Sequence, residues 1–171
     1  TSRVVNVTVN NPGVPATNSL VNFGAVWKYL DNGSDQGTAW RQPGFDETAW
    51  KSGPAQLGYG DGDEATVVED NATPGFNRPD TDRYLTTYFR RAFVLADPAA
   101  FTSLNLSVLF DDGAVVYLNG TEALRCNMPA GMIAYNTPAI LSGVPDNTVW
   151  RTNPPPGLLR AGTNVVAVQI H

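Results

Sequence analysis

The feature that most constrains the fold of this chain is a series of short segments in which apolar and polar residues alternate. Every second side chain of residues 104–110 (LNLSVLF) is apolar, and this two-residue period is that of a half-buried β-strand. Residues 114–118 (AVVYL) and 122–126 (EALRC) flank Asn119-Gly120, the dipeptide most typical of a tight hairpin turn. This stretch therefore predicts consecutive antiparallel strands.

Further strands are expected in the apolar parts of residues 20–30, 83–95 and 161–171. Pro-Gly and Gly-Pro pairs interrupt residues 39–60, and residues 61–82 are acidic and broken, which is typical of a long surface loop. We expect no helix longer than a single turn, which would begin at Pro98. The prediction is an all-β antiparallel sandwich that forms one domain over residues 1–171.

Charge and composition exclude several classes of partner. The formal net charge is −5, so the chain lacks the basic surface that a nucleic acid or an anionic membrane requires. No apolar run reaches the roughly 20 residues that span a bilayer, so we expect no membrane insertion. The single cysteine, Cys126, cannot form an internal disulfide and is expected to be buried.

Catalysis is also disfavoured. The only histidine is His171, so a serine or cysteine nucleophile has no histidine base within the body of the chain. A glycosidase would need two carboxylates about 5–10 Å apart in a cleft, and the acidic residues 61–82 are the first place to look for them. Most acidic residues stand beside Gly, Asn or Pro, where turn geometry explains them. We therefore expect that the domain is not an enzyme.

Four motifs occur in order along the chain: WRQPGFDETAW (40–50), YFRRAFVL (88–95), DDGAVVYLNGTEALRCNMP (111–129) and AGTNVVAVQIH (161–171). Together they resemble the galactose-binding-like jelly roll, in the variety that is appended to large secreted bacterial enzymes and surface proteins. The pattern is also similar to the sugar-binding domain of β-galactosidase-type glycosidases. The resemblance implies a jelly-roll sandwich and a non-catalytic accessory domain that attaches a secreted enzyme or a bacterial cell-surface protein to a polysaccharide or oligosaccharide.

The chain departs from the family pattern at two points. Glu47 stands where the resembling sequences often carry a second aspartate, which is a conservative change. The resembling domains also continue through one more strand beyond the position of His171, so we expect the sandwich to lack its final strand. This departure motivates an alternative function, a structural or assembly module whose sheet is completed by another segment or another domain of a parent protein.

Aromatic side chains are the natural candidates for sugar binding, because their faces stack against the C–H surfaces of a saccharide. Trp40, Tyr59, Tyr135 and Trp150 lie among glycines, prolines and polar residues, and we take them as the ligand-binding candidates. Two loops are expected to present Trp150. By contrast, Trp27 lies within an apolar strand segment and is expected to fill the core, and the resemblance implies that Trp50, which closes the FDETAW turn, is structural as well.

The acidic residues offer two further candidate sites. Asp111-Asp112 followed by Gly113 is typical of a turn in which the glycine takes a positive φ, and it also resembles the Asp-Asp pair of calcium-dependent flocculin-type lectins. We favour the turn and keep both aspartates as candidates for contact with a ligand. The spacing of Asp61, Asp63 and Glu64 is suggestive of calcium ligands, although the twelve-residue loop of an EF-hand is missing. The resemblance to these jelly rolls implies one structural Ca²⁺ in the domain.

Overall fold

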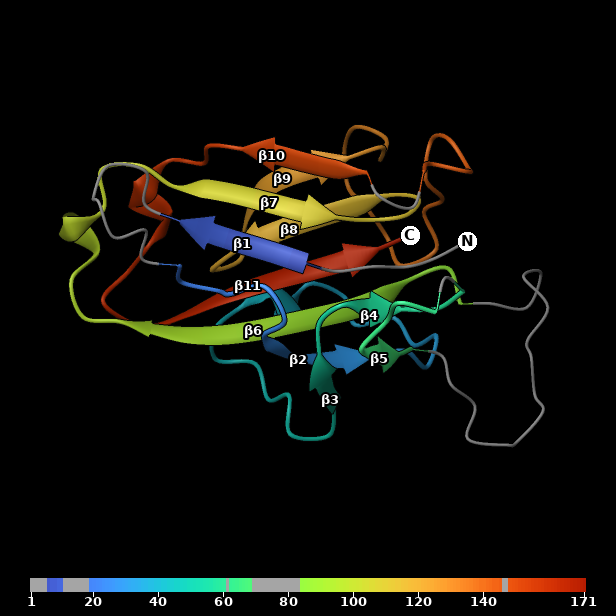
Figure 1. Cartoon of the computed structure of the whole chain (residues 1–171), viewed down its shortest axis with the longest axis horizontal. Coiled ribbons are helices and arrows are strands. Elements are labelled where there is room, and N and C mark those ends of the chain that lie inside the picture. Colours follow the sequence, from blue (N-terminus) through green and yellow to red (C-terminus); the bar gives the residue numbers. More distant parts are fainter. Residues whose placement is uncertain (1–5, 11–18, 61, 69–83, 146–147) are drawn as a thin grey trace.

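The computed structural model describes residues 6–10, 19–60, 62–68, 84–145 and 148–171 (Figure 1). The strands are β1 (Asn6–Asn10), β2 (Val26–Leu30), β3 (Lys51–Pro54), β4 (Leu57–Gly58), β5 (Thr66–Val67), β6 (Thr87–Leu95), β7 (Asn105–Leu109), β8 (Ala114–Leu118), β9 (Thr121–Cys126), β10 (Val149–Thr152) and β11 (Gly162–Ile170). The helices of the described part are the single 3-10 turns η1 (Ala39–Arg41), η3 (Pro98–Ala100) and η4 (Pro156–Leu158). None of the described helices has the length and apolar character that crossing a membrane would take.

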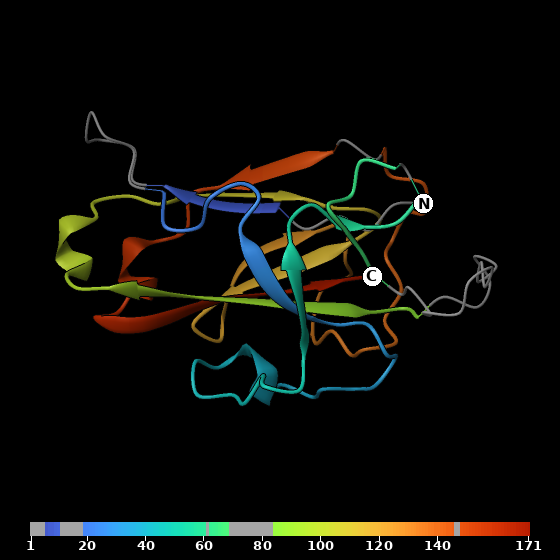
Figure 2. The same ribbon diagram turned by 60° about the horizontal axis from the view of Figure 1, so that its bottom comes forward.

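Two antiparallel sheets face each other and form a sandwich (Figures 1 and 2). The larger sheet has the strand order β3-β2-β6-β11-β8-β9, and the smaller sheet has the order β1-β7-β10. A short parallel pair, β4-β5, lies beside them. The predicted all-β antiparallel sandwich is thus confirmed, whereas the prediction of a further strand after residue 171 stays a prediction.

The hairpin predicted around Asn119-Gly120 is present. Asn119 has a φ of 53° and Gly120 a φ of 86°, the left-handed pair that a two-residue hairpin turn needs. Strands β8 and β9 run antiparallel from this turn, with Leu118 opposite Thr121. The 3-10 turn at Pro98 is confirmed as well, and the Asp97 side chain caps it by accepting a hydrogen bond from the Ala99 N–H at 2.9 Å.

Several strands carry too weak a pattern to be found in the sequence. Strand β10 lies in a proline-rich region, and β3 (KSGP) contains a glycine and a proline, yet both occupy sheet positions. Each is held by a strongly patterned neighbour, since β10 pairs with β7 and β3 pairs with β2. Their conformation therefore depends on tertiary pairing more than on local propensity.

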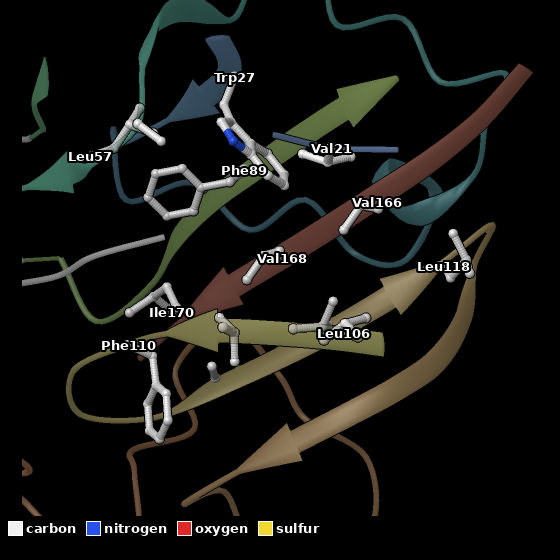
Figure 3. Packing of buried hydrophobic residues seen from close by; sticks show 14 of the residues in the cluster. Val21, Trp27, Leu57, Phe89, Leu106, Phe110, Leu118, Val166, Val168 and Ile170 are labelled. Carbon is white, nitrogen blue, oxygen red and sulfur yellow. The ribbon is translucent and has the colours of Figure 1, made fainter. Parts of the chain in front are cut away.

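The main core fills the space between the two sheets (Figure 3). The small sheet contributes the alternate residues of the 104–110 segment, which are at most 1% exposed, as the alternation predicts. The large sheet contributes Trp27, Phe89, Val166, Val168 and Ile170, all at most 1% exposed. At roughly 1.5–3 kcal/mol for each fully buried large apolar side chain, this layer is the principal source of stability.

A second apolar cluster lies on the opposite, outer face of the large sheet. Residues 31–50, which include η1, fold back beneath this face, as the turned view shows (Figure 2). The cluster consists of Trp40, Trp50, Tyr88, Val115, Tyr117, Met128, Ile133, Val165 and Ala167. Strand β8 and the central part of β11 are therefore buried on both faces, which explains why β8 and residues Val165–Val168 form continuous apolar runs.

Candidate functional site

The candidate site is the end of the sandwich at which β7 and β11 finish and β6, β8 and β10 begin (Figure 1). We call it the loop end, and it comprises residues 84–86, 110–113, 127–145 and 148–150 together with His171. The segment that joins β9 to β10 is the longest connection there. Four of the eight candidate residues that the structure describes lie at this end: Asp111, Asp112, Tyr135 and Trp150.

Asp112 organises the loop end. Its Oδ1 atom accepts hydrogen bonds from the backbone N–H groups of Gly143, at 2.6 Å, and Val144, at 3.1 Å. The Asn127 side chain donates to the carbonyl oxygens of Asp112, at 2.9 Å, and Leu141, at 2.7 Å. These bonds tie the long connection to the turn after β7, which agrees with the favoured interpretation of Asp111-Asp112 as a turn.

Asp111 and Gly113 are buried within this turn, and Asp111 is only 1% exposed. The expected positive φ at Gly113 is wrong, since this glycine is not among the residues with left-handed backbone. A Cβ atom at Gly113 would instead lie 2.4 Å from Sδ of Met128 and 3.0 Å from Cβ of Ala139. Close packing, and not backbone conformation, is the reason for the glycine.

His171 closes the same end from the large sheet. Its backbone N–H donates to the Gly113 carbonyl at 2.8 Å, and its own carbonyl accepts from the Gly113 N–H at 3.0 Å. Oγ1 of Thr86 lies 3.0 Å from Nδ1 of His171 and also donates to the carbonyl oxygen of Tyr135. The half-buried Tyr135 is thereby fixed to the start of β6, while its ring packs against the outer cluster.

Trp150 is the exposed aromatic residue of the loop end. Trp150 is 47% exposed, which confirms its predicted exposure. It lies on strand β10, so the expectation that two loops present it is wrong. The indole packs edge-on against Phe110, with ring centroids 6.0 Å apart and an interplanar angle of 82°. A buried neighbour therefore orients the indole and leaves part of it in contact with solvent.

The other tryptophans are structural. Trp27 and Trp50 are buried, as predicted. Trp40 was expected to be exposed, but this is wrong: it is 0% exposed, and its ring centroid lies 4.8 Å from that of Tyr88 and 5.8 Å from that of Tyr117. Its indole N–H donates to the Gly37 carbonyl at 3.1 Å, so its polar atom is satisfied inside the cluster.

Tyr59 was also expected to be exposed, and this too is wrong, because it is 7% exposed and belongs to the core between the sheets. Glycines on both sides of Tyr59 made its surroundings look open in the sequence. They instead allow the chain to turn closely over the core, and Gly60 has a φ of 112°. Of the four predicted aromatic ligands, Trp150 is thus the exposed one.

The predicted calcium ligands do not form a site among the described residues. Asp63 accepts from the Gln56 side chain at 3.0 Å, and Glu64 accepts from the Gly62 N–H at 3.0 Å. Asp61 lies outside the described residues. No three His, Cys, Asp or Glu side chains of the described ranges gather as metal ligands would. The expected calcium ion therefore stays a prediction.

Cys126 offers no reactive nucleophile. The residue is buried in the main core, as predicted, and burial raises the pKa of its thiol to about 12. A thiol with that pKa stays protonated at neutral pH and is a poor nucleophile. Its role is therefore to fill space between the sheets.

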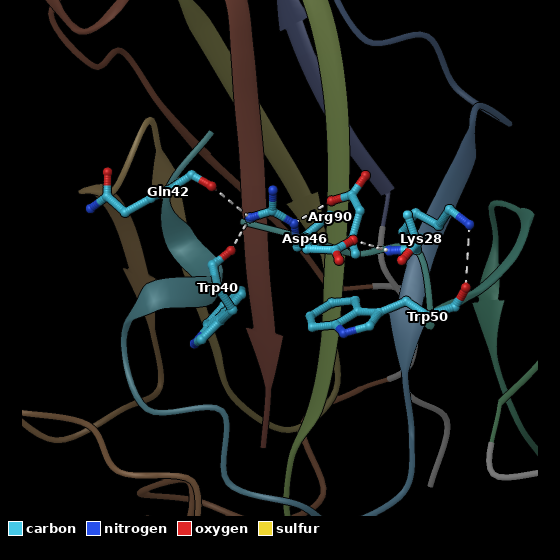
Figure 4. Close-up of polar contacts among 8 residues, drawn as sticks. Lys28, Trp40, Gln42, Asp46, Trp50 and Arg90 are labelled. Atoms are coloured by element: carbon cyan, nitrogen blue, oxygen red, sulfur yellow. Dashed lines mark hydrogen bonds and ion pairs between the residues drawn. The ribbon is translucent and has the colours of Figure 1, made fainter. Parts of the chain in front are cut away.

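The structure also reveals a charged cluster that sequence reasoning missed (Figure 4). Arg90, which is 1% exposed, forms an ion pair with Glu47 and donates to the carbonyl oxygens of Trp40 and Gln42. Beside it, a pocket of about 260 Å³ opens on the outer face of the large sheet. The signal that could have found it is an arginine inside the strongly patterned β6 segment, because an arginine is buried only when it is paired.

Comparison with known proteins supports the fold. No family model matches the chain, and no curated protein matches it either. Among solved structures, a β-glucuronidase from glycoside hydrolase family 2 superposes with a TM-score of 0.54 at 15% identity, over 95% of this chain and 14% of that chain. β-Glucuronidase 2 of Bacteroides uniformis matches with a TM-score of 0.49 at 16% identity, over 96% of this chain and 14% of that chain.

A β-D-mannosidase from Dictyoglomus thermophilum also matches, with a TM-score of 0.44 at 15% identity, over 85% of this chain and 15% of that chain. The chain thus spans about one seventh of the length of these enzymes. At these identities the similarity concerns the fold. The chain shares the fold of one part of the β-glucuronidase with the TM-score of 0.54.

Proposed function

We propose that this chain is a non-catalytic carbohydrate-binding module of a larger protein. The observation that carries the proposal is the half-exposed indole of Trp150 at the loop end, which Phe110 holds edge-on. A rigid aromatic surface at one end of a β-sandwich is suited to stacking against a sugar ring. The similarity in fold to part of a β-glucuronidase supports the same class of ligand.

In this proposal the polar groups near Trp150 orient the sugar. Oδ1 of Asp112 is engaged by two backbone N–H groups, so its Oδ2 atom remains to accept a hydrogen bond from a sugar hydroxyl. The Tyr135 ring packs against the outer cluster on the far side of the large sheet, so this tyrosine is not part of the proposed site. Such a shallow site binds weakly, and several copies in one protein would strengthen attachment to a polymer.

The test is calorimetry and affinity electrophoresis of the 171-residue chain against plant, algal and microbial glycans, each with Ca²⁺ or with EDTA. We expect one class of glycan to bind, Trp150→Ala to abolish this binding and Trp150→Phe to keep part of it. Phe23→Ala is the matched control, because Phe23 is an exposed aromatic residue (74%) in the segment before β2. Absence of binding to every glycan with Ca²⁺ present, or binding that survives Trp150→Ala, would contradict the proposal.

A structural or assembly module is the second candidate. It is favoured by three apolar side chains on the β9–β10 connection, Met132 (90% exposed), Ile140 (62%) and Leu141 (65%). Such side chains are typical of a surface that packs against another domain. Light scattering distinguishes this candidate, because a module of this kind should self-associate through these residues, and serine substitutions at Met132 and Leu141 should make it monomeric.

We further propose that the parent protein is secreted or displayed on a bacterial cell surface. The low content of charged residues (16%) and the single cysteine suit a small extracellular β-domain that needs no disulfide. Fractionation of cells that produce the full-length protein would test this.

A further inference from the structure

Arg41, at the end of the 3-10 turn η1, lies over the outer face of the large sheet and stacks on Tyr117. Its guanidinium carbon is 4.2 Å from the ring centroid of Tyr117 and 5.7 Å from that of Trp40. Both rings belong to the outer cluster and are at most 4% exposed, so neither is free to move aside. The cation–π contact therefore holds the guanidinium against a rigid surface.

The guanidinium of Arg41 has no acceptor within the described part of the chain. None of the ion pairs of these residues includes Arg41. Nε of Arg41 is buried without a hydrogen-bond partner, and the residue as a whole is partly buried, so the Nη groups at its tip are the part that meets solvent. Five N–H donors without a protein acceptor are unusual at this depth, because buried polar groups are nearly always hydrogen-bonded.

The carboxylate beside Tyr117 is already engaged by another arginine. Glu122 is the partner of Tyr117 in the pairing of β8 with β9, so both side chains lie on the outer face. Arg125 binds both oxygens of Glu122, through Nε at 2.8 Å and Nη2 at 2.7 Å. This bidentate pair satisfies Glu122 and leaves the charge of Arg41 uncompensated.

The other charged groups around η1 are engaged as well. Arg90 is neutralised by its ion pair with Glu47. Asp35, which precedes η1, accepts from the Gly37 N–H at 2.8 Å and forms no ion pair within the described residues. Arg41 is thus an unpaired cation on a fixed aromatic support, in a chain whose net charge is −5.

We propose that Arg41 binds an oxyanion of an acidic glycan, namely a uronate carboxylate or a sulfate ester. The inference rests on the proposed function for the class of ligand and adds a contact point on the outer face of the large sheet. Since Nε is buried, Nη1 and Nη2 donate in parallel to two oxygens of the anion. Stacking on Tyr117 fixes the guanidinium before binding, so little side-chain freedom is lost when the ligand arrives.

The test is NMR titration of the ¹⁵N-labelled 171-residue chain at low salt with sodium D-glucuronate, sodium D-glucose 6-sulfate or D-glucose. We expect a saturable shift of the Arg41 Nε–Hε signal and the Tyr117 amide signal with a charged sugar, and the tighter of the two identifies the anion. The affinity should fall at least about threefold in about 0.5 M NaCl, because salt screens the charge. Equal shifts from glucose, or none from either charged sugar, would overturn the proposal.

Arg41→Gln should weaken binding of the charged sugar by roughly tenfold or more, as the loss of a charged hydrogen-bond donor implies. Arg41→Lys keeps the charge without the paired donors and should give an intermediate affinity. Arg151→Gln is the matched control, since Arg151 is an exposed arginine on β10 of the small sheet. Unchanged affinity in Arg41→Gln, or an equal loss in Arg151→Gln, would refute the assignment. If Arg41→Gln does not fold, unchanged affinity in Arg41→Lys refutes it instead.

Failure of this site and failure of the proposed function are distinguishable, because Trp150 lies on the small sheet. Binding of the charged sugar should survive Trp150→Ala, and binding of a neutral glycan at the loop end should survive Arg41→Gln. Loss of the charged sugar in Trp150→Ala would place the anion at the loop end and overturn the assignment to Arg41.

Discussion

The ion pair between Arg90 and Glu47 offers the sharpest test of how the outer cluster is held together. Arg90 is 1% exposed, whereas the Glu47 side chain is 24% exposed, so Glu47→Gln leaves a positive charge in a largely dry environment. Removing one partner of a fully buried pair costs about 3–5 kcal/mol, because the remaining charge is left without compensation. Arg90 retains its hydrogen bonds to the carbonyl oxygens of Trp40 and Gln42, and Glu47 is partly solvated, so the cost should lie at or below the lower limit of this range.

We therefore expect Glu47→Gln to lower the free energy of unfolding by about 2–3 kcal/mol, which corresponds to a loss of roughly 4–12 °C in Tm for a domain of this size. Urea unfolding followed by tryptophan fluorescence measures this directly, since Trp40 and Trp50 lie in the same cluster.

Glu122→Gln is the matched control, because it removes a carboxylate from an exposed i,i+3 pair with Arg125 at 2.7 Å. Glu122→Gln should lower the free energy of unfolding by less than about 0.5 kcal/mol. The double variant Glu47→Gln/Arg90→Met should be less destabilised than the sum of the two single variants by at least about 1 kcal/mol, because it leaves no unpaired charge. Equal, small effects of Glu47→Gln and Glu122→Gln would refute the reasoning.

Three further outcomes are expected. Trp40→Ala should destabilise the domain by about 3–5 kcal/mol in urea, because it empties the centre of the outer cluster, and a cost below 1 kcal/mol would contradict that burial. Gly113→Ala should cost about 1–3 kcal/mol, since its Cβ would lie 2.4 Å from Sδ of Met128, and Met128→Ala should relieve part of this in a double variant. Burial raises the pKa of Tyr88 from 10.0 to about 12, so the folded state favours the neutral phenol. The resulting contribution to stability is complete below pH 10 and is lost as the pH rises towards 12. The urea concentration at the midpoint of unfolding should accordingly decrease as the pH is raised from about 9 to about 12. The decrease should be less steep in Tyr88→Phe.

Much of the fold could be predicted because alternation reports a local property of a strand. The side chains of residues 104–110 point alternately to the two faces of β7, so the apolar ones had to meet a second layer. Asn119-Gly120 similarly specifies a left-handed turn whatever surrounds it. Strand β10 has no such local signal, and its place at the edge of the small sheet follows from pairing with β7.

The candidate site was less predictable, because exposure is a property of the whole fold. Trp40 and Tyr59 stand among polar residues and glycines, as exposed aromatics do, yet residues 31–50 fold back and bury Trp40, and Tyr59 turns into the core. Trp150 has equally polar neighbours and remains half exposed, because β10 lies at the edge of its sheet. Nothing in the three local sequences distinguishes these outcomes.

By itself, then, the sequence determined that the chain is an antiparallel β-sandwich, because strand period and turn chemistry act over a few residues. Only the tertiary structure decided which rings meet solvent, and only it brought the Glu47 carboxylate to Arg90, which lies in a distant segment of the chain. The physical reason is that burial and charge pairing depend on contacts between segments far apart in the chain, which no local pattern encodes.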